Sequence, residues 1–162
     1  MMPTWIIWLE NSWLNAVVTA IPWGFPIAEA LHFVGLAILV GALALIDLRM
    51  LGYARAMSVK SIHQLLPWAW YGFALNAITG IFFFLTQPSF YYPNVAFRVK
   101  LILIALAGLN ALWFELNVNR KLDSWPDDAN FPGQAKLMAS SSLVLWVAVI
   151  CFGRFIMYWP PI

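Results

Sequence analysis

A long run of uncharged residues constrains this chain more than any other feature of its sequence. From His63 to Phe97 the chain includes no Lys, Arg, Asp or Glu. A helix needs about 20 apolar residues to cross the hydrocarbon layer of a bilayer, and this run is longer than that. Of the 162 residues, 63% are hydrophobic and 10% are charged, whereas about a quarter of a soluble domain is charged. The chain is therefore expected to fold in lipid.

Four apolar windows of sufficient length are bounded by charged residues, Pro or Gly, and they predict membrane-spanning helices over residues 26–51, 61–85, 95–118 and 136–159. The first 20 residues have no Lys or Arg and carry polar residues in their centre, unlike a signal peptide or a span. Helical spacing predicts an interfacial amphipathic helix over about residues 4–20. The predicted fold is an all-α integral membrane four-helix bundle, with residues 1–162 forming a single domain.

The distribution of Lys and Arg predicts the orientation of the bundle. The first–second and third–fourth connections hold six basic residues, namely Arg49, Arg55, Lys60, Arg120, Lys121 and Lys136. The opposite side holds three, namely Arg98, Lys100 and Arg154. By the positive-inside rule, both basic loops are expected in the cytoplasm and both termini outside.

Five ionisable residues from three spans gather near the predicted outer ends of the helices: Glu29, His32, Arg98, Lys100 and Arg154. Ionisable groups at membrane depth are costly and are candidates for function. Glu29 and His32 share a helix face, so the carboxylate would orient the imidazole or pair with Arg98. The alternative is that the three basic side chains extend to lipid headgroups and Glu29 neutralises one of them.

His32 is the strongest single candidate, because an imidazole one to two turns below the interface is where a b-type heme or a metal would be ligated. The three basic residues nearby would suit the heme propionates. The alternative is a histidine hydrogen-bonded to a neighbouring helix. His63 lies about 20 Å away in depth, so the two histidines of one chain are not expected to hold one heme. A sixth ligand would come from Met157, from His32 of a second copy, or from nothing.

Other chemistries have little support in the sequence. A net charge of +2 is too small and too scattered for nucleic-acid binding. The single cysteine, Cys151, cannot form an intrachain disulfide or supply an iron–sulfur cluster. No CxxC, HExxH, GxxxxGK[ST] or GxSxG pattern occurs, and an autonomous enzyme is not expected.

The remaining polar residues of the spans are interpreted as structural. Asp47 and Arg49, near the inner end of the first span, are expected to form an exposed ion pair. Asn76 and Asn110 are expected to hydrogen-bond across helices, with a quinone or substrate contact as the alternative. Small residues four positions apart, which would allow close helix approach, occur at Ala37 and Gly41 and at Ala107 and Ala111.

Two segments resemble a group of small uncharacterised bacterial four-helix inner-membrane proteins. They are ALHFVGLAILVGALALIDLRMLG, residues 30–52, and LTQPSFYYPNVAFRVKLILIALAGLNALWFE, residues 85–115. The LHxxG opening, the DLRxLG exit and the FxxKLxLIxLAGLN third helix carry the resemblance, and that third helix is more distantly similar to the one in the CopD copper-resistance membrane domain. The resemblance implies a shared bundle and a ligand role for His32. In the inner membrane of a bacterium, the orientation predicted from the basic loops would place both termini in the periplasm. The chain departs from a bis-histidine heme protein because it lacks a second histidine at matching depth.

These observations favour a small redox-associated membrane protein that binds a b-type heme through His32 and passes electrons to or from quinone or a larger complex. The alternative is a cofactor-free accessory subunit that anchors a larger membrane assembly through its apolar surface, which is rich in the ten Trp of the chain. A third hypothesis is a metal-handling protein that uses His32, Cys151 and Met157. The expected partners are the lipid bilayer and either further copies of the chain or a larger complex.

Overall fold

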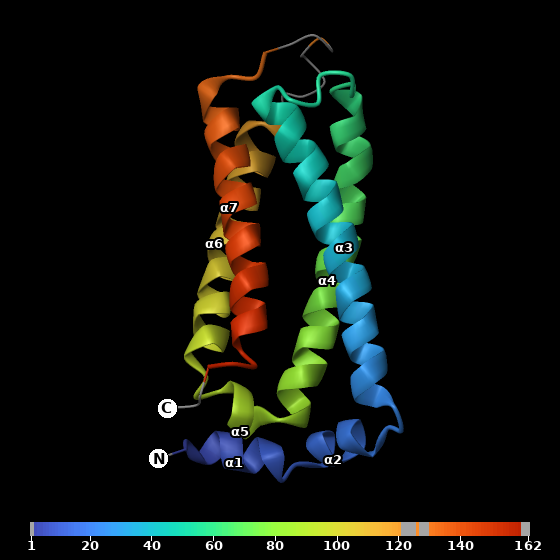
Figure 1. The fold of residues 1–162 in the computed structure, drawn as a ribbon, viewed down its shortest axis with the longest axis vertical. Coiled ribbons are helices and arrows are strands. Elements are labelled where there is room, and N and C mark those ends of the chain that lie inside the picture. The colour runs from blue at the N-terminus through green and yellow to red at the C-terminus, as the bar shows by residue number, and fades with distance from the viewer. Residues whose placement is uncertain (1, 121–125, 127–129, 160–162) are drawn as a thin grey trace.

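Four long helices stand side by side in the computed structural model, and short helices lie across one end of them (Figure 1). The structure describes residues 2–120, 126 and 130–159. The long helices are α3 (Gly24–Leu51), α4 (Lys60–Thr86), α6 (Val95–Asn117) and α7 (Gly133–Phe155). Each is long and apolar enough to cross a membrane, and the described residues contain no strand. The predicted all-α four-helix membrane bundle is confirmed, and the chain is a multi-pass membrane protein.

The N-terminal segment forms two short helices rather than the one expected over residues 4–20. They are α1 (Thr4–Glu10) and α2 (Trp13–Ala20), and both cross the end of the bundle (Figure 1). The break has a local cause, because the Ser12 side chain accepts a hydrogen bond from the Asn15 N–H at 3.3 Å and so begins a new helix. The Asn15 amide in turn donates to the Leu85 carbonyl at 2.7 Å, which ties α2 to the end of α4.

The long helices form two pairs, α3 with α4 and α6 with α7, and α3 also packs against α7. The α3 and α4 backbones approach closely at two glycines, Gly35 and Gly72. A Cβ atom added at Gly72 would lie 2.6 Å from the Leu39 nitrogen and 2.8 Å from the Gly35 oxygen. A Cβ added at Gly41 would meet nothing within 4 Å. The close approach predicted at Ala37 and Gly41 is therefore wrong, and the glycine contact between α3 and α4 takes its place.

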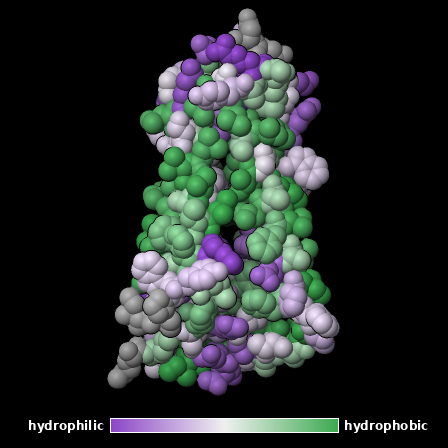
Figure 2. Space-filling model, in the orientation of Figure 1, coloured by the Kyte–Doolittle hydropathy of each residue, from purple (hydrophilic) through white to green (hydrophobic). Residues whose placement is uncertain are grey.

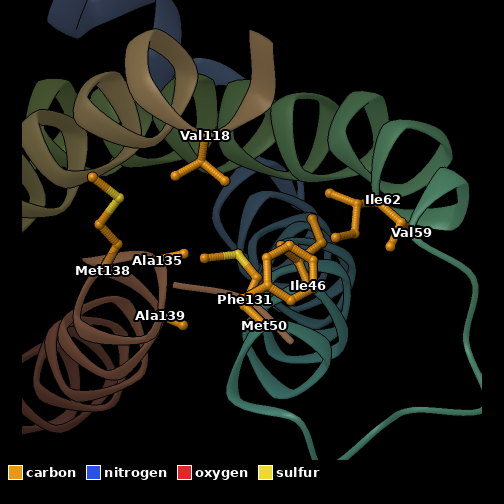
Figure 3. Packing of buried hydrophobic residues seen from close by; sticks show 9 residues of the cluster. All are labelled: Ile46, Met50, Val59, Ile62, Val118, Phe131, Ala135, Met138 and Ala139. Carbon is orange, nitrogen blue, oxygen red and sulfur yellow. The ribbon is translucent and has the colours of Figure 1, made fainter. Parts of the chain in front are cut away.

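A buried hydrophobic cluster joins all four helices at the loop end, by which we mean the end where α3 connects to α4 and α6 to α7 (Figures 1 and 3). Its members are Ile46, Met50, Val59, Ile62, Val118, Phe131, Ala135, Met138 and Ala139. Since lipid tails are as apolar as these side chains, the cluster stabilises the bundle mainly by close packing. Part of the connection between α6 and α7, including Lys121, lies outside the described residues.

The α1–α2 end is held differently. A smaller cluster of Tyr91, Ala96 and Ile156 lies there, next to α5 (Pro88–Tyr91). Asn94 is fully buried, and its side-chain oxygen accepts the Phe97 N–H at 3.1 Å, so Asn94 caps the start of α6. Between the two ends, hydrophobic residues cover the surface, which is hollowed along the boundary between the two helix pairs (Figure 2).

Candidate functional site

His32 lies in the half of the bundle nearer α1 and α2, about two helical turns from the start of α3. Its half-buried imidazole packs toward α4. The Nδ1 atom is 2.7 Å from the Thr79 Oγ1 atom, and the ring centroid is 5.4 Å from that of Phe83. Two groups of α4 therefore fix the position of the imidazole.

The hydrogen bonds of Thr79 determine which imidazole nitrogen carries the proton. Thr79 is 4% exposed, and its single hydroxyl hydrogen is donated to the Leu75 carbonyl at 2.7 Å. The hydroxyl oxygen must then accept from the Nδ1–H of His32. In the neutral imidazole this arrangement leaves the Nε2 lone pair available, which is the tautomer that a metal or a heme iron requires.

Lys100 lies on the other helix pair, on α6. Its partly buried side chain runs against α7, where the Nζ atom is 3.3 Å from the point that a Cβ at Gly153 would occupy. The ammonium group acts electrostatically on His32. His32 on α3 and Lys100 on α6 thus belong to opposite helix pairs.

The two arginines of the predicted cluster do not join His32. Arg98 donates from Nε to the Tyr92 carbonyl at 2.9 Å, and its guanidinium lies 5.1 Å from the Tyr92 ring centroid. Arg154 donates to the Tyr158 hydroxyl at 2.9 Å and lies 5.2 Å from that ring. Both arginines are exposed among interfacial aromatic side chains, as expected for residues that extend toward headgroups.

Glu29 is exposed and does not orient the imidazole, because Thr79 does so. The charge of Glu29 acts on α5: burial, and then this charge, raise the pKa of Tyr91. Within the described residues no ion pair joins Glu29 to Arg98, since the Arg98 guanidinium is directed at Tyr92. The five predicted residues therefore separate into a His32–Lys100 site and three peripheral residues.

Additional ligands for His32 are scarce. The described part of the chain contains no group of three or more His, Cys, Asp or Glu placed to hold a metal ion. Cys151 is exposed on α7, and Met157 is 64% exposed beyond the end of that helix. His63 lines a groove of about 430 Å³ between α4 and α6 at the loop end. Along α4 it lies about 24 Å from Thr79, at the rise of an α-helix.

One residue of the site and one feature of the loop end were not predicted. Thr79 was missed, although its distance from the end of α4 matches the distance of His32 from the start of the antiparallel α3, which was a usable signal.

At the loop end, the exposed ion pair expected between Asp47 and Arg49 is wrong. Asp47 is 4% exposed and Arg49 is 2% exposed. The Arg49 Nε donates to the Met57 carbonyl at 2.6 Å, because the guanidinium folds under the α3–α4 connection.

Comparison with protein-family models, with curated proteins and with solved structures found no match for this chain. The resemblance to the bacterial four-helix family and to the CopD membrane domain therefore stays a prediction.

Proposed function

We propose that the protein is a small redox-associated membrane protein that binds a b-type heme through the Nε2 atom of His32 and passes electrons to or from quinone or a larger complex. The proposal places it in a bacterial inner membrane, with the α1–α2 end toward the periplasm. The observation that carries it is the 2.7 Å hydrogen bond between His32 and Thr79. This bond gives a histidine within a membrane span the tautomer and the fixed orientation of an axial ligand.

The side chains around His32 provide part of what a heme site requires. His32 offers one axial nitrogen, and Lys100 offers one positive charge suited to a propionate. Arg98 and Arg154, expected to share that role, are engaged by tyrosines. The described side chains place no second axial ligand beside His32, so the sixth position would belong to solvent or to His32 of a second copy. When bound, heme supplies a one-electron couple that no side chain of this chain provides.

The chain itself would orient and shield the site. Thr79 holds the imidazole in one tautomer, and its own hydroxyl is held by the Leu75 carbonyl. Phe83 packs on the imidazole and reduces its access to water. Lys100 presents a positive charge that favours an anionic group on the same side of the bundle.

The test is a reduced-minus-oxidised absorption spectrum of detergent-purified protein from heme-replete cells. We expect Soret and α bands in the wild type and their loss in His32→Ala. The matched control is His63→Ala, which removes the other histidine of the chain and should keep both bands. Absence of bands in the wild type, or bands that survive in His32→Ala, would overturn the proposal. A heme-free protein that co-purifies with a stoichiometric partner would support the accessory-subunit alternative.

A second comparison tests the role of Thr79. Thr79→Val keeps the shape of the side chain but removes the hydrogen-bond acceptor, and changes of this kind weaken ligand binding by about 10- to 100-fold. Thr79→Ser retains the hydroxyl and should bind heme as the wild type does. Equal heme retention in the Val and Ser variants would show that the hydrogen bond has no part in ligation.

A further inference from the structure

Asp47 is a buried carboxyl group that the proposed function does not use. It lies on α3 about one turn, or roughly 6 Å, before the helix ends at the loop end. The residue is 4% exposed, and it occupies the contact between α3 and α7, where the Ser142 hydroxyl is its polar neighbour. This contact joins the two helix pairs.

One oxygen of this carboxyl group is not satisfied. The Oδ2 atom is buried, and no hydrogen-bond donor of the described residues reaches it. An ionised carboxylate in such a place would have the Ser142 hydroxyl beside it but no donor at Oδ2 among the described residues, and burial of an ion with so little compensation is unfavourable. A carboxylic acid avoids this cost because it is neutral.

In the described part of the structure, the charged groups of the surrounding elements make other contacts. Arg49, on the same helix, donates to the Met57 carbonyl and stacks on Phe131 at 5.3 Å. On α7, the Lys136 ammonium donates to the Asn130 side chain at 3.3 Å. On α4, His63 lines the groove that faces α6. Ser142 therefore remains as the polar side chain directed at Asp47 in the described part of the bundle.

We propose that Asp47 is a proton-binding site within the membrane span, occupied at neutral pH, which exchanges its proton with the aqueous phase at the loop end. The proton replaces the donor that Oδ2 lacks, and it leaves the carboxyl group neutral between α3 and α7. Loss of the proton would create a charge that needs water, so it would favour opening of the contact between the two helix pairs. Proton binding is thereby coupled to how closely the pairs pack, independently of any heme at His32.

Labelling with the hydrophobic reagent dicyclohexylcarbodiimide tests this directly on wild-type protein in lipid. The carbodiimide adds to a protonated carboxyl group and rearranges to a stable N-acylurea, so the labelled residue gains the mass of the reagent. We expect peptide mass spectrometry at neutral pH to find the label on Asp47, and the label to be lost as the pH is raised. Glu10, Glu29 and Glu115 are exposed and serve as internal controls that should remain unlabelled.

Two variants complete the test. Asp47→Asn keeps the size of the side chain and should lose the label, whereas Glu115→Gln should retain it. Infrared spectra should show a protonated-carboxyl band in the wild type that is missing from Asp47→Asn. Glutamate labelling without label on Asp47, or labelling of Asp47 that does not change with pH, would overturn the proposal. Protection of Asp47 by sodium chloride but not by choline chloride would show that a metal cation, rather than a proton, is the ligand.

Discussion

The two ends of this bundle are held together by different means. At the loop end, side chains from all four long helices meet in one buried cluster, and Asp47 and Arg49 lie buried beside it. At the α1–α2 end, a smaller buried cluster is packed against by aromatic side chains, and Asn94 and the crossing helices α1 and α2 add polar contacts. The surface is hollowed between the pairs (Figure 2).

We infer that one end of the bundle serves mainly stability and the other ligand binding. A closely packed end in lipid depends on shape, because no hydrophobic transfer from water favours helix association there. His32 and Lys100 belong to opposite helix pairs and lie in the half of the bundle nearer the α1–α2 end. Stability should therefore depend mainly on close packing within the α3–α4 pair and at the loop end, and ligand binding on polar residues at the α1–α2 end.

The largest loss of stability is expected for Gly72→Leu, because α3 and α4 pack against each other at Gly72 and extend through both ends of the bundle. The added side chain would collide with backbone atoms of Leu39 and Gly35, which cannot rotate away. We expect a loss of roughly 4 kcal/mol or more in the free energy of unfolding, in the range of severe overpacking. Denaturant titration in mixed micelles, followed by circular dichroism, measures the loss.

The matched control is Gly80→Leu on the same helix, where a Cβ atom would meet nothing within 4 Å. Its stability should stay within about 1 kcal/mol of the wild type, or rise, because Gly is a poor helix former. Equal losses in both variants would mean that α3 and α4 are not in close contact at Gly72.

The next largest loss of stability is expected for a substitution confined to the loop end. Met138 is 1% exposed within the loop-end cluster, and Met138→Ala should cost about 2–3 kcal/mol through the cavity that it leaves. Leu137→Ala is the control, since the neighbouring Leu137 is 58% exposed on the lipid side. The His32-dependent heme bands should persist in Met138→Ala. Loss of those bands together with stability would show that the two ends do not act separately.

The sequence predicts the fold closely because lipid requires long apolar helices that satisfy their own backbone hydrogen bonds. The windows at 26–51 and 95–118 differ from α3 and α6 by at most two residues. The last window began too late, because α7 starts directly after Pro132, and extended too far, because α7 ends at Phe155, before the aromatic residues of the interface.

The contacts between helices were less predictable, because spacing within one helix does not say which helix it faces. Asn110 donates to the Met138 carbonyl at 3.0 Å, which confirms an amide bond across helices. Asn76 instead donates to Gly72 of its own helix at 2.9 Å, since it lies where α3 and α4 approach closely. The burial of Asp47 was missed for the same reason, because its environment is set by Ser142 on a helix distant in sequence.

A smaller loss of stability is expected for a substitution at the α1–α2 end, and it tests whether that end opens separately from the loop end. Asn94 caps α6 and also donates to the Ile156 carbonyl at 2.9 Å, so it links the start of α6 to the end of α7. Asn94→Ala should cost about 1–2 kcal/mol, the upper range for a lost cap, because a buried carbonyl also loses its partner.

Amide hydrogen exchange can assign this effect to one end of the bundle, which a measurement of global unfolding cannot do. In Asn94→Ala, amides at the end of α7, near Ile156, should exchange faster, while amides around Met138 should keep the wild-type rate. Asn117→Ala is the control at the loop end, because the exposed Asn117 amide bonds only to Trp113 of its own helix in the described structure. If Asn94→Ala accelerated exchange equally at both ends, the bundle would open as one unit, and the separate roles of its two ends would be refuted.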